Sequence, residues 1–160
     1  MRRSTLGAAG ALAAGLATMS LAFAPTASAA VSPGSATATY DCGSWGGGTA
    51  TITMTHSGST AQVWITAPVT TPVAVGADTI NSTFTLDNST GPDRVFTGKK
   101  NPAIPAGGTA NLGPLTATPV VAGDRLNSYF AGTALKLVIF GVTVNCDALT
   151  SQSPGNFVIS

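Results

Sequence analysis

Apolar and polar side chains alternate along two neighbouring segments in the first half of the chain. In residues 49–56, small and aliphatic side chains alternate with threonines. Residues 61–67 alternate in the same way, after the polar stretch Ser57-Gly58-Ser59. A period of two is typical of a strand with one buried face, and a short glycine-containing break is typical of a hairpin turn. This pattern therefore predicts a β-hairpin here.

The remainder of the chain contains further strand patterns separated by Gly- and Pro-rich breaks. The longest apolar run, Ala134 to Cys146, is apolar on both faces, which is typical of a central strand, and Gly141 within it predicts a bulge. Pro68 and Pro72 predict an edge or a loop between them. Other strands are predicted over 37–42, 79–86, 95–96, 110–118, 125–131 and 156–160, with loops over 43–48, 87–93 and 99–108.

Composition agrees with an all-β fold. Thr and Val are frequent, whereas Glu, a common helix former, does not occur. Gly and Pro recur between short strand patterns, which is typical of a β-sandwich or a β-barrel. We predict a two-sheet sandwich of about seven to nine strands, with a β-barrel as the alternative.

The first 29 residues have the features of a secretory signal peptide. Arg2 and Arg3 precede the apolar stretch 6–24, and Ala27-Ser28-Ala29 then provides small residues at a cleavage site. We therefore predict a signal peptide over 1–29 and a single secreted domain over 30–160. The domain is expected outside the cell or at the cell wall, without membrane insertion after cleavage.

The two cysteines, Cys42 and Cys146, lie near the two ends of the predicted domain. Exported proteins meet an oxidising environment in which disulfides persist. The chain has no CxxC spacing, and no His or Lys flanks either cysteine to activate a thiolate. We predict a structural disulfide between them.

Charge excludes several classes of partner. The whole chain has 7 basic and 6 acidic residues, so 30–160, without Arg2 and Arg3, sums to 5 − 6 = −1. Nucleic-acid binding requires a basic face, and electrostatic membrane binding requires basic clusters, so neither is expected. One His and two cysteines expected to be bonded do not provide the ligands of a zinc site. We predict no metal and no cofactor.

One face of the predicted hairpin suggests ligand binding. Thr51 and Thr53 share it with Gln62 and Trp64, and Trp45 lies in the preceding turn. An exposed indole beside hydroxyls and an amide suits a sugar, because the ring stacks on its apolar face while polar groups bind its hydroxyls. These five residues are the predicted ligand-binding set, and a polysaccharide is the predicted ligand.

Other interpretations of this face remain open. Thr is a common solvent-facing strand residue, and Trp64 in that case covers the edge of the core or lies inside it. A row of threonines is also a feature of ice-binding surfaces, which require a flat repeated array, and one strand alone does not supply that array.

Two other functional classes are compatible with parts of the sequence. A protein-interaction or structural role, such as protease inhibition, would use an exposed rigid loop, with 68–72 and 102–105 as candidates. A hydrolase would use His56 with a serine and an aspartate, but no nucleophile-elbow motif accompanies this histidine, and its position beside a turn predicts exposure to solvent. We therefore predict a non-catalytic binding protein.

Three short motifs give the chain a resemblance to a group of proteins. Tyr40-x-Cys42 in the first strand, the segment 67–76 with its prolines and Gly76, and the late strand 142–146 resemble small secreted actinobacterial proteins with two cysteines and no known function. The resemblance covers most of 30–160. It implies a disulfide-closed, immunoglobulin-like β-sandwich outside the cell and supplies no catalytic residues.

Overall fold

A computed structural model describes residues 30–160, so the predicted signal peptide lies outside the described residues. Twelve short elements follow one another along the chain, and all but one are strands. They are β1 (Val31–Ser32), β2 (Ser35–Asp41), the 3-10 turn η1 (Gly43–Trp45), β3 (Gly47–Ser57), β4 (Thr60–Thr70), β5 (Asn81–Asn88), β6 (Arg94–Gly98), β7 (Thr109–Ala117), β8 (Arg125–Ser128), β9 (Thr133–Ile139), β10 (Val142–Ala148) and β11 (Phe157–Ile159). No helix in this part of the chain is long and apolar enough to cross a membrane.

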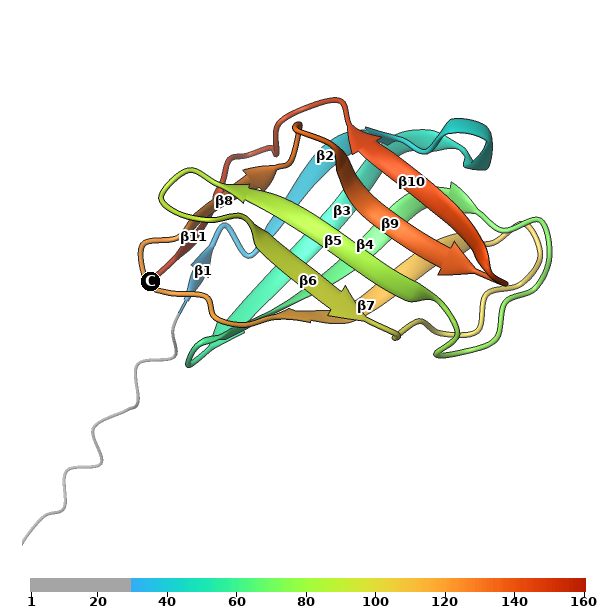
Figure 1. The fold of residues 1–160 in the computed structure, drawn as a ribbon, viewed down its shortest axis with the longest axis horizontal. Helices are drawn as coiled ribbons and strands as arrows, with labels where there is room; N and C mark the ends of the chain where they lie inside the picture. The colour runs from blue at the N-terminus through green and yellow to red at the C-terminus, as the bar shows by residue number, and fades with distance from the viewer. Residues whose placement is uncertain (1–29) are drawn as a thin grey trace, which may run out of the picture.

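Eight of the strands close into an antiparallel barrel (Figure 1). Around the barrel their order is β5, β6, β7, β4, β3, β2, β10 and β9. Pairing between β9 and the first half of β5, where Phe84 lies opposite Leu135, completes the ring. The all-β prediction is confirmed, and the architecture is the predicted alternative, a barrel. The two-sheet sandwich is not confirmed, because the β5–β9 pairing closes the sheet. The sequence could not distinguish the two architectures, since strand alternation is the same in both.

Three short strands extend the sheet beyond the barrel. The last residues of β5 pair with β8, β8 pairs with β11, and β11 pairs with β1. These strands lie together at one end of the molecule (Figure 1). Here the two ends of the described region meet, since the Ser160 amide donates to the Ala30 carbonyl at 3.0 Å. The first and last strands of the described region, β1 and β11, are therefore neighbours in this sheet.

The barrel interior is filled by the apolar residues that alternate along each strand. Tyr40, Phe84 and Phe96 form an aromatic row with ring centroids 6.4 Å apart for each neighbouring pair. Burial raises the pKa of Tyr40 to about 12, although the Ser128 hydroxyl lowers it in part.

The predicted hairpin is confirmed as β3 and β4. Its two-residue turn begins at Gly58, whose φ of 62° suits glycine.

The predicted disulfide is confirmed. Cys42 follows β2, Cys146 lies in β10, and the two are bonded across a sequence separation of 104 residues with their Cα atoms 4.0 Å apart. Both are buried. The bond reinforces a short β2–β10 contact, in which Asp41 pairs with Asp147 and Tyr40 with Ala148.

A buried ion pair joins β6 to the chain just before β8. Asp124 is 3% exposed and accepts hydrogen bonds from Arg94 Nε at 2.8 Å and Nη2 at 2.9 Å. The Asn88 side chain and the Val121 amide also donate to it, at 2.9 and 3.0 Å. Burial alone would raise the pKa of Asp124, but these donors and the Arg94 charge lower it below its ordinary value. The carboxylate therefore stays ionised inside the fold.

Two strand predictions were wrong. The apolar run 134–146 is a hairpin, because Phe140 and Gly141 form a turn between β9 and β10, and Ile139 pairs with Val142. Phe140 made the apolar pattern continue through this turn, and Gly141 is a turn residue and not a bulge. The β4 strand also continues through Pro68 to Thr70, where a loop or edge had been predicted. A register irregularity against β7 between Thr66 and Thr70 accommodates it.

Phe140 has an unfavourable backbone conformation that a substitution can relieve. Its φ is 51°, a left-handed value that costs an L-residue about 1–2 kcal/mol, and its side chain is 65% exposed. Asn tolerates this conformation, and Asn-Gly is the preferred sequence for such turns. We expect Phe140→Asn to raise the free energy of unfolding by about 1 kcal/mol in urea titrations.

The matched control is Phe140→Ala. Alanine removes the same exposed ring but has no side-chain amide that can hydrogen-bond locally in the left-handed conformation, so no comparable gain is expected. An equal gain from alanine would show that the benefit comes from removing the exposed ring, and not from the backbone.

Candidate functional site

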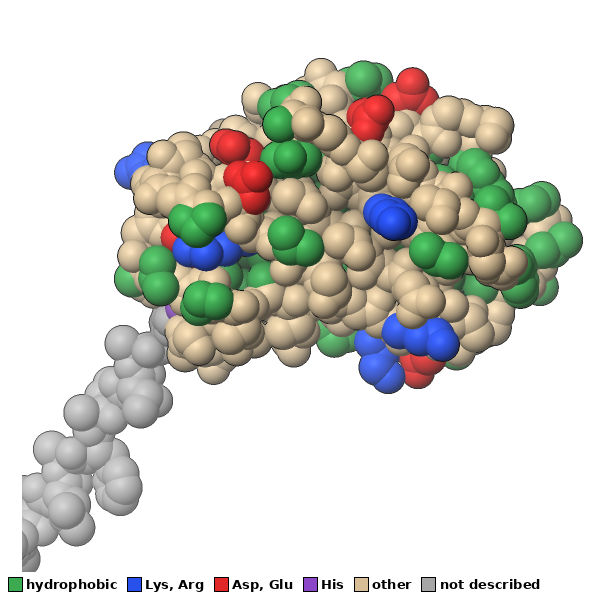
Figure 2. All heavy atoms as spheres, viewed as in Figure 1, with side chains coloured by type: hydrophobic (Ala, Val, Ile, Leu, Met, Phe, Trp, Pro, Cys, Tyr) green, Lys and Arg blue, Asp and Glu red, His purple; other side chains and the backbone are tan. Residues whose placement is uncertain are grey.

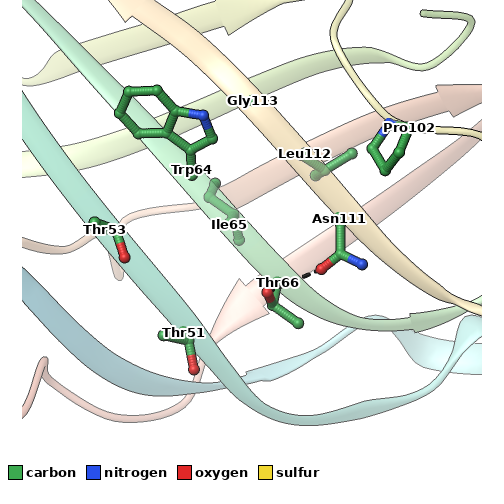
Figure 3. Close-up of a pocket in the computed structure, with 9 residues that line it drawn as sticks. All are labelled: Thr51, Thr53, Trp64, Ile65, Thr66, Pro102, Asn111, Leu112 and Gly113. Atoms are coloured by element: carbon green, nitrogen blue, oxygen red, sulfur yellow. Dashed lines mark hydrogen bonds between the residues drawn. The ribbon is translucent and has the colours of Figure 1, made fainter. Parts of the chain in front are cut away.

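A groove of about 260 Å³ lies on the outer surface of β3, β4 and β7 (Figure 3). These three strands lie at the back of the barrel in the view of Figure 1. The loop between β6 and β7 contributes one wall through Pro102. The lining residues are Thr51, Thr53, Trp64, Ile65, Thr66, Pro102, Asn111, Leu112 and Gly113.

Strand register brings the polar members of this groove together. Thr53 pairs with Trp64 across β3 and β4, and Thr51 pairs with Thr66 in the next outward row. Thr66 in turn pairs with Asn111 of β7. Outward residues in such rows have neighbouring side chains on one face of the sheet. The groove therefore combines hydroxyls, an amide and an indole on one curved surface.

Trp64 lies opposite a bulge in β7. Val63 pairs with Leu115 and Ile65 with Leu112, so Gly113 and Pro114 together face the single residue Trp64. A Cβ added at Gly113 would lie 2.6 Å from the Val63 carbonyl oxygen and 2.9 Å from the Trp64 Cα. Gly113 is thus required for the close approach of β7. The arrangement leaves Trp64 37% exposed beside the groove.

A hydrogen bond orders the polar wall of the groove. Thr66 Oγ1 donates to Asn111 Oδ1 at 2.9 Å, across two strands that are 45 residues apart in sequence. The Nδ2 atom of Asn111 points away from Thr66 (Figure 3). The amide can therefore donate to a ligand while Thr66 Oγ1 can accept from it.

The groove is uncharged, in contrast to another face of the barrel. Neither β3 nor β4 contains Asp, Glu, Lys or Arg, and no titratable side chain lines the groove. Lys, Arg and Asp side chains are visible on the face that carries β5, β6 and β9 (Figure 2). A ligand of the groove would thus meet hydrogen-bonding groups and an aromatic ring, without a charge to pair with.

The structure separates the five predicted binding residues into three places. Thr51, Thr53 and Trp64 line the groove together. Gln62 lies one outward row further along β4, opposite Thr55, and lines a neighbouring hollow. Trp45 is half-buried in η1, packs against the core, and lines a different hollow with Thr70 and Pro72 among others. Trp45 and Trp64 therefore do not line the same hollow.

Sequence reasoning missed part of the groove. Asn111 and Pro102 were not predicted to take part, since the pairing of β4 with β7 is not visible in the sequence. Thr66 has the same phase as Gln62 and Trp64 and so lies on the predicted face, but it was not placed in the predicted binding set. Of the loops considered for protein interaction, Pro102 lines this groove and Pro72 lines the Trp45 hollow.

His56 is not solvent-exposed as predicted. It is half-buried near the end of β3, with the phase of Ile52 and Met54, and within residues 30–160 both ring nitrogens are shielded from solvent and have no hydrogen-bond partner. Ser57 is nearby, but no aspartate hydrogen-bonds to the imidazole in this part of the chain. The described residues also hold no cluster of three or more His, Cys, Asp or Glu suited to a metal.

Comparisons with known proteins return no relative: no family model, curated protein or solved structure matches the chain. The protein is therefore described by its fold and its groove. It is a disulfide-linked antiparallel β-barrel that presents an uncharged groove of threonines, an asparagine and a tryptophan on its outer surface.

Proposed function

We propose that the protein is a secreted, non-catalytic module that binds a polysaccharide of the cell envelope or the extracellular space. The observation that carries the proposal is that the partly exposed Trp64, three threonines and Asn111 line the same groove. An indole stacks on the apolar face of a pyranose, while hydroxyls and amides bind its hydroxyl groups.

The size and chemistry of the groove support surface binding without bond cleavage. Its volume of about 260 Å³ lies below the roughly 300–1,000 Å³ of pockets that enclose a small molecule. A ligand would thus be contacted on one side, as a polymer can be. The lining residues include no carboxylate, imidazole or amine that could act as a general acid or base.

The proposal is tested by co-sedimentation of the purified domain with insoluble peptidoglycan, chitin and cellulose. Soluble fragments of a polymer that binds are then titrated while tryptophan emission is followed. A Trp45→Phe variant makes Trp64 the single reporter, since the chain has two tryptophans. Saturable binding with a shifted emission supports the groove, and the absence of binding to all three polymers would overturn the proposal.

Variants of the groove should lose binding without losing the fold. We expect Trp64→Ala to weaken binding at least tenfold, because a central aromatic contact commonly contributes 2 kcal/mol or more. Thr51→Val, which removes a hydroxyl at nearly constant volume, should weaken it several-fold. Affinity is measured by depletion of protein onto the polymer, and near-UV circular dichroism verifies the fold.

Thr49→Val is the matched control. Thr49 is exposed on the same face of β3 as Thr51 but does not line the groove. It should bind as the wild type does. Equal losses for Thr49→Val and Thr51→Val would indicate a general effect of removing surface hydroxyls and would contradict a site at this groove.

A further inference from the structure

A second hollow lies beside the groove on the same two strands. This hollow of about 320 Å³ is lined by Thr55, His56, Ser57, Thr60 and Gln62. Thr55 pairs with Gln62 in the outward row that follows Thr53 and Trp64. The two hollows therefore occupy consecutive positions on the β3–β4 ribbon. Its outward pairs are Thr51 with Thr66, Thr53 with Trp64, Thr55 with Gln62, and Ser57 with Thr60.

The length of this ribbon exceeds that of one sugar ring. Six residues separate Thr51 from Ser57, and a strand rises about 3.3 Å per residue, so the outward rows extend over roughly 20 Å. Several pyranose rings of an extended chain fit along such a distance. A single sugar would contact one hollow and leave the other row of hydroxyls and the Gln62 amide without a ligand.

The chemistry of the ribbon selects against charged ligands. Every outward residue in the four rows is a threonine, a serine, a glutamine or a tryptophan. A carboxylate or phosphate group transferred from water to this surface would lose hydration without gaining a Lys or Arg partner, and both ring nitrogens of His56 in the second hollow are shielded from solvent. Hydroxyl groups lose much less, because threonine and amide groups replace their hydrogen bonds to water.

We propose that the ligand is a neutral glycan chain several sugar units long, bound in an extended conformation along β3 and β4 from Thr51 to Ser57. This inference rests on the proposed function and adds the length, charge and direction of the ligand. Trp64 provides the aromatic contact in the first hollow, and Thr55 with Gln62 provides polar contacts in the second.

The test is a titration of the wild-type domain with chitin-derived and cellulose-derived oligomers, from the monosaccharide to the hexasaccharide, by calorimetry. We expect the hexasaccharide of the preferred series to bind at least tenfold more tightly than the disaccharide. Raising the salt concentration should change its affinity less than twofold, since no Asp, Glu, Lys or Arg lines either hollow. A polygalacturonate oligomer of equal length should not bind.

Variants in the second hollow separate chain length from binding itself. Gln62→Ala and Thr55→Val should weaken the hexasaccharide several-fold but leave the disaccharide unchanged, whereas Thr49→Val should change neither. Equal affinity for disaccharide and hexasaccharide would overturn the extended-chain inference while the proposed function stands. Salt-sensitive binding of polygalacturonate would overturn neutrality. Failure of every oligomer and every insoluble polysaccharide would overturn the proposed function itself.

Discussion

Replacing Cys42 and Cys146 together by alanine is expected to lower the free energy of unfolding by about 4–5 kcal/mol. The bond closes a loop of about a hundred residues, so its removal greatly increases the conformational freedom of the unfolded chain. Domains of this size are stable by only about 5–15 kcal/mol, and the variant should therefore lie near the limit of folding. Urea unfolding followed by circular dichroism measures the change.

Reduction of the wild-type protein is the control for packing. Both sulfurs are buried, so alanine also removes a small apolar volume. If the cross-link is the main contribution, the reduced wild type should lose nearly as much stability as the double variant. A reduced protein as stable as the oxidised one would contradict the prediction, as would free thiols detected by alkylation and mass measurement of the unreduced protein.

Replacing Asp124 by asparagine is expected to lower the free energy of unfolding by about 3–5 kcal/mol. The substitution keeps the shape of the side chain but leaves the guanidinium of Arg94, whose side chain is 11% exposed, without a counter-charge. Asp124 also holds the Val121 amide and the Asn88 side chain, so the change affects contacts among β5, β6 and the β7–β8 connection. Denaturant titration at neutral pH measures the loss.

The matched control is Asp78→Asn. Asp78 also pairs with a basic residue, since Lys100 Nζ lies 3.1 Å from Asp78 Oδ2, but both side chains are more than half exposed. Exposed ion pairs contribute about 0–1 kcal/mol, so this variant should be nearly as stable as the wild type. A similar loss at both positions would show that burial of the Arg94–Asp124 pair is not the cause.

The pH dependence provides a second test of Asp124. Its pKa in the fold is lower than its ordinary value of 3.8, so the unfolded chain binds the proton more tightly. The stability from this group is therefore fully present above the ordinary value and decreases as the pH falls through the folded pKa. The difference between wild type and Asp124→Asn should be constant near neutrality and shrink under strongly acid conditions. A constant difference down to the acid limit would contradict the assignment.

Local sequence features predicted local structure well. The β3–β4 hairpin was visible because its alternation and its Gly58 turn are contained within about 20 residues. The prediction of one strand over 134–146 was wrong for a local reason as well. Phe140 in the turn has the hydropathy of a core residue although it is exposed. His56 was predicted to be exposed from its position beside a turn alone. It shares the phase of Ile52, a signal that this prediction did not use, and it is half-buried.

The candidate site was predictable only where it lies on the hairpin. Thr51, Thr53 and Trp64 share a groove because β3 and β4 pair directly. Asn111 and Pro102 belong to segments that reach this surface only when β7 pairs with β4. The packing of Trp45 against the core, away from Trp64, likewise depends on contacts between distant parts of the chain.

The sequence by itself determined most of the inward-facing side chains of the β3–β4 hairpin, where this hairpin turns, and that residues 30–160 have two cysteines and few charges. These properties depend on the period of a strand and on residue chemistry, which neighbouring residues specify. Only the tertiary structure decided that the sheet closes through the β5–β9 contact and that β7 completes the groove. Both contacts join segments about 50 residues apart, and strand alternation fits either a sandwich or a barrel equally well.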